Sequence, residues 1–533
     1  MTKIGRYITI AILFTVGAFG FRLYLSFHLP PDDDDDGKFY SQIARNLLDH
    51  RGYSGEEEEP FVPTYVRTPG YPLILAGAYY LFGQGNDRAV RVIQATADTA
   101  TCWLIALLAL AWSPAQWNPE KRRRAMLIAL GLAAFCPFTA VYVTTILTET
   151  WATLLITALA LVATLALKTE RPARAALLWV AAGLLGGAAT MCRPDCALFV
   201  GGAGAMLVGA GLFRAFVASQ NSPLARKGES LRTALATVVS CVALTIGFSA
   251  VLAPWTIRNA RVFGVFQPVA PQYANMPYEF VPFGYVSWLR TWVDEERYVM
   301  PFEETIDLYP IHVEDMPGQA FDSPEERDRV AALLERYDNP EKREAKLDDE
   351  SEDDDDASGP GPSVKMTPEI DAGFRQIADE RIARHPIRHY VVLPLKRAAA
   401  LWFDTHSQYY PFQGQLFPWS NLDGEAHQQY WLSLFALLTG VYTTVALIGV
   451  LVMWTTRGSR RWVVLLALLV APRLAFLAAQ EHPEPRYTVE YFAFAAAVGG
   501  IALASLRLNN LRAPGGPLRL CAEYWPLRCV LKE

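Results

Sequence analysis

Five consecutive aspartates, Asp32 to Asp36, stand directly after the first long apolar segment of the chain. That segment, residues 6–28, is long enough to cross a bilayer, so the aspartates fall where the membrane meets water. Residues 40–49 then alternate apolar and polar faces with helical spacing, as expected of a helix on the membrane surface. Carboxylates in this position are suited to chemistry on a lipid-linked substrate.

Asp36 is the best candidate for a general base, with Asp35 beside it. A general base must be ionisable and must lie near the reacting hydroxyl in a site that excludes water. Asp36 directly precedes the helical pattern, where it could serve as the N-cap. Asp32–Asp34 fit a solvated acidic run better. The run could also hold a divalent cation, although His406 and His482 are isolated in the sequence and the cysteines form no CxxC pair.

Four arginines could bind a phosphate group on the same side of the membrane: Arg67, Arg193, Arg258 and Arg486. The planar guanidinium suits bidentate contact with phosphate oxygens. Prolines near Arg67 and Arg486 limit the motion of the backbone, so these two are the strongest candidates. Each arginine could instead anchor the end of a helix at the membrane surface.

Two further acids fall within apolar segments. Glu149 begins a predicted span, where it could take part in catalysis or simply favour the helix N-terminus. Asp98 lies in the middle of another predicted span, and we expect its carboxylate to face the interior of the bundle because exposure to lipid would be costly.

Composition indicates a multi-span membrane protein with one large hydrophilic insertion. The chain is 52% hydrophobic and its mean hydropathy is +0.15, which is too apolar for an ordinary soluble enzyme. Its formal net charge is −6 and no basic face stands out, which excludes nucleic acid as an expected partner.

Apolar runs predict ten spans and therefore an all-α polytopic bundle of about 10–12 transmembrane helices. The predicted spans are 6–28, 88–112, 124–147, 149–168, 174–191, 196–218, 233–255, 430–454, 462–480 and 487–507. If the basic clusters between them face the cytoplasm, the spans alternate without conflict and both termini lie inside. Residues 70–83 are short for a membrane crossing, although an eleventh span there is an alternative. Residues 388–403 resemble an interfacial helix.

This topology predicts three parts. Residues 1–255 form a membrane module whose first outer loop, 29–87, carries the aspartates, and residues 430–533 form further membrane helices and a cytoplasmic tail. Between them, residues 256–429 form an extracytoplasmic insertion with helices at 323–337 and 368–386. Its acidic stretch at about 346–364 has the composition of a disordered linker.

The chain resembles the bacterial GT-C glycosyltransferases, which include protein O-mannosyltransferases and the lipid A aminoarabinose transferase. The resemblance covers the membrane part in order, and no single motif carries it. The matching segments are DDGKFYSQIARNLLDHRGYS, TYVRTPGYPLILAGAYYLFG, RVIQATADT, TTILTET, CRP, PWTIRNARVFGVFQPV, HPIRHYVVLPLKRAAALW and EPRYTVEYF. Such enzymes take a sugar from a polyprenyl-phosphate carrier and place it on an acceptor outside the cytoplasm. The family's key acid lies in the first outer loop, where Asp36 matches it best.

The resemblance implies an integral protein of the bacterial inner membrane whose active site faces outward. We predict inverting transfer with Asp36, Asp35 or Glu149 as catalytic acids and with the four arginines at the donor phosphate. Tyr40, Tyr71 and Tyr487 are expected to position substrate. The alternatives are a flippase or transporter of lipid-linked sugars and a ligase that moves whole glycans. An enzyme is favoured because the polar residues gather on one face instead of lining a path through the membrane.

Overall fold

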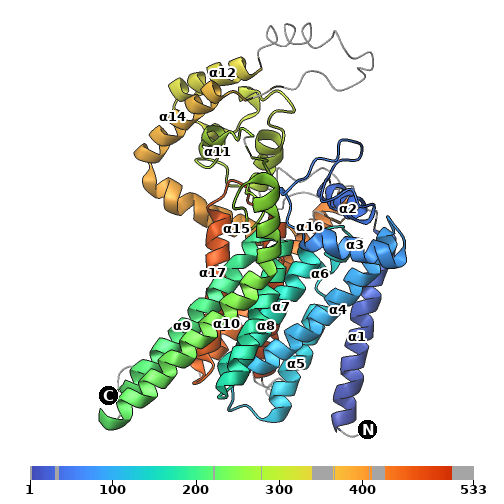
Figure 1. Ribbon diagram of the computed structural model, residues 1–533, viewed down its shortest axis with the longest axis vertical. Helices are drawn as coiled ribbons and strands as arrows, with labels where there is room; N and C mark the ends of the chain where they lie inside the picture. The colour runs from blue at the N-terminus through green and yellow to red at the C-terminus, as the bar shows by residue number, and fades with distance from the viewer. Residues whose placement is uncertain are drawn as a thin grey trace.

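The protein is seen here as a computed structural model that describes residues 3–29, 35–219, 223–277, 279–338, 364, 366–406, 409–410 and 426–506. The predicted sites at Asp32–Asp34, almost all of the predicted acidic linker and the predicted cytoplasmic tail from residue 507 lie outside the described residues. The regular elements of the described residues are all helices (Figure 1). A bundle of long helices lies below, and a smaller helical part sits on one of its ends.

The bundle and the smaller helical part, named the outer part because it lies outside the bundle, are built from distinct sets of helices. The long helices are α1 (Lys3–His28), α4 (Asp87–Trp112), α5 (Pro119–Ala134), α7 (Glu149–Lys168), α8 (Pro172–Cys192), α9 (Ala197–Ser219), α10 (Pro223–Phe263), α16 (Ala426–Thr455), α17 (Arg460–Ala478) and α18 (Tyr491–Ser505). Shorter helices near the upper end of the bundle are α2 (Asp35–Leu48), α3 (Gly70–Phe82), α6 (Pro137–Ala140) and α15 (Leu393–Phe403). The outer part contains α11 (Phe283–Leu289), α12 (Pro324–Tyr337) and α14 (Pro368–Arg384).

The structure supports an integral multi-pass membrane protein with fewer full-length spans than the ten predicted. Within the described residues, eight helices are long and apolar enough to cross a membrane, or nine if α5 and its bent continuation count as one span. The tenth predicted span, 487–507, is the 15-residue α18. Such a helix is about 22 Å long, which is short of the hydrocarbon thickness. It is buried along almost its whole length against α5 and α16, so it fills the bundle core instead of facing lipid.

A buried arginine, Arg22, stabilises the bend after α5, where the chain turns by 52° into α6. The two Nη groups of Arg22 donate to the carbonyl oxygens of Ala134 at 2.8 Å and Ala133 at 3.2 Å, at the end of α5. Its Nε donates to Asp98 at 2.6 Å. Backbone groups freed by a break inside a bilayer must find partners within the protein, and Arg22 supplies them. Asp98 therefore faces the bundle interior, as predicted.

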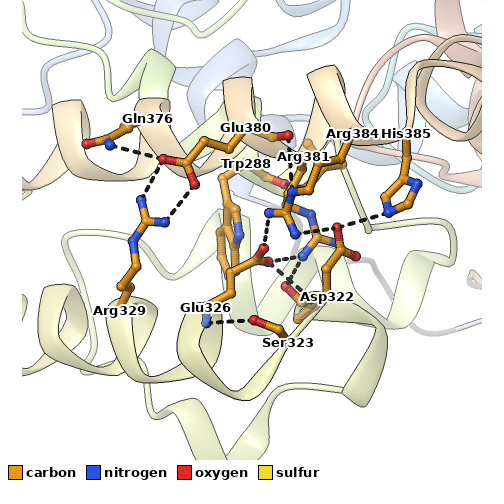
Figure 2. A network of polar contacts seen from close by, with 12 residues as sticks. Trp288, Asp322, Ser323, Glu326, Arg329, Gln376, Glu380, Arg381, Arg384 and His385 are labelled. Atoms are coloured by element: carbon orange, nitrogen blue, oxygen red, sulfur yellow. Dashed lines mark hydrogen bonds and ion pairs between the residues drawn. The ribbon is translucent and has the colours of Figure 1, made fainter.

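The two predicted outer helices are confirmed. The Ser323 hydroxyl accepts a hydrogen bond from the Glu326 N–H at 3.2 Å and so caps α12, and α14 runs over most of the predicted segment. Figure 2 shows how charged side chains join the two: Glu326 pairs with Arg381 and, at 2.6 Å, with Arg384. Beside them, buried aromatic side chains around Trp288 give the outer part its own core.

Candidate functional site

A cavity of about 950 Å³ lies where the membrane helices meet the outer part. Its charged and aromatic lining comes from segments that are far apart in the sequence: the first turns of α2, the loop before α3, the turn between α8 and α9, the loop before α11, the short helical segment Met300–Glu304 and the loop after α17. These lining residues include Asp36, Tyr40, Arg67, Arg193, Asp195, Tyr273, Glu279, Glu303, Glu304, His482 and Tyr487.

Asp36 lies between two of the predicted phosphate-binding arginines. Its Oδ1 accepts a hydrogen bond from Arg67 Nη2 at 2.6 Å, and its Oδ2 lies 3.9 Å from Arg486 Nη2. The side chain of Asp36 is 28% exposed, so it remains accessible from the cavity. Because α2 begins at Asp35, Asp36 lies in the first helical turn and not at the predicted N-cap.

Asp35 points away from this site. Its side chain is 98% exposed and pairs with Lys38 at 3.3 Å. Neighbouring residues on a helix point in directions about 100° apart, so only one of two adjacent carboxylates can face a given cavity. The geometry therefore brings Asp36 to the cavity and leaves Asp35 in solvent.

Arg193 belongs to a buried chain of alternating charges beneath the cavity. Its Nη1 donates to Glu149 at 2.6 Å, and its Nε lies 3.6 Å from Asp195. Asp195 in turn pairs at 2.6 Å with Arg473, which also contacts Glu490 at 3.0 Å. Glu149 is buried and is not part of the cavity lining. Its position suits the support of Arg193 better than direct contact with a substrate.

Arg486 lies behind the cavity wall, where Tyr487 covers it. Arg486 contacts Glu484 at 2.7 Å and the hydroxyl of Tyr409 at 3.1 Å. The ring of Tyr487 lines the cavity, with the guanidinium of Arg486 at 5.4 Å and that of Arg193 at 5.2 Å from the ring centre. Both guanidiniums are therefore within the distance at which cation–π attraction to the Tyr487 ring operates.

Two predicted residues lie away from the cavity. Arg258 donates to the carbonyl oxygen of Thr64 at 2.7 Å and lies over the ring of Trp255, so it fastens the loop before α3 to α10. Tyr71 is fully buried and donates to Gln94 at 2.9 Å. Its ring packs edge-on against Tyr40, which does line the cavity.

The opposite wall of the cavity contains residues that sequence reasoning missed. His482 lies 3.5 Å from Glu303, 3.6 Å from Glu304 and 3.4 Å from Glu484. Burial lowers the pKa of His482, but Tyr487 and the neighbouring carboxylates raise it further, and the net pKa is well above its ordinary value. No local spacing joins His482 to residues 303 and 304, so the sequence offered no signal for this cluster.

The described residues contain no group of three His, Cys, Asp or Glu side chains arranged to hold a metal ion. Three of the five aspartates lie outside those residues, so the cation at the aspartate run stays a prediction. Chemically, the described site offers one accessible carboxylate, two cations at Arg67 and Arg193, and a histidine, His482, surrounded by carboxylates.

No family model matches the chain, and no curated protein is significantly similar to it. Solved structures of helical membrane enzymes do match. They include the archaeal oligosaccharyltransferase AglB from Archaeoglobus fulgidus in complex with an inhibitory peptide and a dolichol-phosphate, at 12% identity and a TM-score of 0.48. A structure of the oligosaccharyltransferase from the same organism, tethered with an acceptor peptide, matches at 13% identity and a TM-score of 0.49. Each match covers 94% of this chain and 50% of the other, so this chain spans about half the length of that protein.

ArnT from Cupriavidus metallidurans, bound to undecaprenyl phosphate, matches at 14% identity and a TM-score of 0.34. That match covers 95% of this chain and 79% of ArnT. The similarity is one of overall helical arrangement.

Proposed function

We propose that this protein is a membrane glycosyltransferase that moves a sugar from a polyprenyl-phosphate carrier to an acceptor on the outer face of a bacterial inner membrane. The observation that carries the proposal is the position of Asp36, in contact with Arg67 and near Arg486, at the wall of a large cavity at the end of a membrane bundle. A base and phosphate-binding cations therefore meet where a lipid-linked donor would present its head group.

The arginines would bind the phosphate that leaves. Charge builds up on this phosphate as the bond to the sugar breaks, and fixed cations in a site shielded from water stabilise such charge. Arg67 and Arg193 line the cavity directly, and Arg486 reaches Asp36 from behind. Glu149, which is buried, and Asp195, which lines the cavity, hold Arg193 in place.

Asp36 would act as the general base. The acceptor's oxygen or nitrogen attacks C1 of the sugar, the bond between C1 and the phosphate oxygen breaks, and that electron pair stays on the phosphate. The proton of the acceptor passes to the Asp36 carboxylate. A phosphate bound at Arg67 would compete for the guanidinium that Asp36 holds in the structure, and so would turn a carboxylate oxygen toward the acceptor. Single displacement at C1 inverts its configuration.

The carrier chain would reach the cavity from the bilayer between α9 and α17. Leu198 on α9 and Phe476 and Leu477 on α17 belong to the apolar part of the cavity lining. Phe476 is also exposed on the surface of the bundle. The two helices pack against each other below this point, so their upper ends form an apolar edge beside the charged wall.

The test is sugar transfer by purified protein in vesicles that contain a panel of polyprenyl-phosphate-linked sugars, with Asp36→Asn as the main variant. We expect its turnover to fall by about 10²–10⁴-fold, the usual contribution of a general base. Asp35→Asn, the matched control on the neighbouring solvent-exposed carboxylate, should keep full activity. Arg67→Ala should weaken donor binding by roughly 10- to 150-fold through loss of a charge-assisted hydrogen bond.

Full activity of Asp36→Asn would overturn the base assignment. Movement of intact lipid-linked sugar across the vesicle membrane, without cleavage of the bond to phosphate, would overturn the transferase proposal and establish a flippase instead.

A further inference from the structure

A second cavity, of about 690 Å³, lies between α1, α5 and α16. It is formed by the early turns of α1, which begins at the end of the bundle opposite the candidate site (Figure 1). Its lining divides into two parts. The apolar part is Ile10, Phe14, Leu127, Ile128, Gly131, Leu132, Phe135 and Tyr442, and the polar part is Arg6, Tyr7, Glu120 and Arg124.

Two aromatic rings line the apolar part of this groove. Phe14 and Phe135 meet edge-to-face with ring centres 6.2 Å apart. Gly131 makes room for them, because a Cβ at that position would lie 3.1 Å from the Phe14 ring. Arg6 and Phe14 are eight residues apart on α1, so the apolar wall extends for about 12 Å from the arginine toward the middle of the bundle. That length accommodates a large part of an acyl chain.

The groove lies at a surface that faces lipid. On α1, the neighbouring side chains Ile8, Ile12 and Leu13 are all more than half exposed. In a membrane-spanning helix such apolar exposure is contact with acyl chains. The lining residue Phe135 is itself 51% exposed, so the groove opens at this apolar surface and is reached from within the bilayer.

The polar end of the groove is positively charged. Arg6 on α1 and Arg124 on α5 both line it, and Glu120 is the acid among the lining residues. Glu120 accepts a hydrogen bond from Tyr7 at 3.4 Å. Basic pockets between membrane helices at the level of the head groups bind anionic lipids, since each arginine attracts the phosphate.

We propose that an anionic phospholipid occupies this groove, with one acyl chain along Ile10 and Phe14 and its phosphate at Arg6 and Arg124. The site is separate from the proposed transferase site and would hold α1 against α5. The same helix α1 leads at its other end toward α2, which carries Asp36. The bound lipid thus fixes the helix that precedes the proposed base.

The test is native mass spectrometry of the purified full-length protein titrated with phosphatidylglycerol, with phosphatidylcholine as the zwitterionic comparison. We expect wild-type protein to bind phosphatidylglycerol preferentially, and each of Arg6→Gln and Arg124→Gln to weaken that binding about fivefold. The matched control is Arg123→Gln, which removes the same charge from the same turn of α5 at an exposed position outside the groove and should bind as wild type does.

A variant that keeps both arginines tests whether lipid binding needs the apolar part of the groove or only the positive charge. Ile128→Trp fills the apolar part and should lose phosphatidylglycerol although both arginines remain, while the thermal midpoint of unfolding shows that the protein is folded. Equal affinity of wild type for the two lipids, or equal weakening by Arg123→Gln, would overturn the proposal. Preferential binding of polyprenyl phosphate that is lost in Arg6→Gln would also overturn it, because the groove would then belong to the carrier.

Discussion

Replacement of Arg22 by methionine tests what holds the bent segment after α5 inside the membrane. The guanidinium is fully buried, and its donors contact Asp98 and the carbonyl oxygens of Ala18, Ala133 and Ala134. One side chain therefore neutralises a buried carboxylate and also satisfies the carbonyl groups at the end of a broken helix. Arg22→Met removes both the charge that pairs with Asp98 and the hydrogen bonds to these carbonyl groups.

The expected loss follows from the burial of both partners. Removing one member of a buried ion pair costs about 3–5 kcal/mol, because the other charge is left without a partner. The carbonyl groups that lose their donor add to this cost. In the double variant Arg22→Met/Asp98→Asn no charge stays buried. It should therefore be more stable than Arg22→Met, with a coupling free energy of about 0.5–3 kcal/mol.

The free energy of unfolding can be measured in mixed micelles titrated with dodecyl sulfate and followed by tryptophan fluorescence. Arg88→Met is the control, since Arg88 lies exposed near the start of α4. Strictly additive effects of Arg22→Met and Asp98→Asn, or a loss in Arg22→Met no larger than in Arg88→Met, would refute the reasoning about the buried pair.

Two further predictions concern the outer part. The pKa of His482, which burial lowers but Tyr487 and the surrounding carboxylates raise well above its ordinary value, makes the protonated form the stabilising one. That contribution to stability is complete below about pH 6.5 and is lost as the pH rises through the raised pKa. The difference in thermal midpoint between wild type and His482→Gln should therefore shrink at alkaline pH. An increase in that difference at alkaline pH would contradict the prediction. Glu326→Gln should weaken hydrogen-exchange protection in α12 and α14 by about 1–3 kcal/mol, because Glu326 and Arg381 are 3% and 2% exposed and Arg381 keeps Asp322 at 3.3 Å as its remaining acidic partner (Figure 2). Arg329→Gln, in an exposed pair, should change it by about 1 kcal/mol or less, and equal effects would refute the distinction.

Local sequence patterns were sufficient to predict most of the helices. Apolar length predicted the spans because a bilayer demands that length of any helix that crosses it. Ser323 and Pro324 predicted the start of α12, since capping depends on the few residues at a helix end. The exception is α18, whose composition suggested a full span. Its short length and its burial by α5 and α16 depend on how the chain packs, and composition alone does not report that.

The sequence by itself determined a membrane bundle with an acidic loop after its first long helix and arginines that could join that loop. Only the tertiary structure decided which of these residues meet. Helix geometry separates Asp36 from Asp35, and the fold brings Arg67 and Arg486 to Asp36 from positions far apart in the chain. The same packing places Arg258 against Thr64 instead of in the cavity. Contacts between distant segments are set by how whole helices pack, so they leave no periodic signal in the sequence.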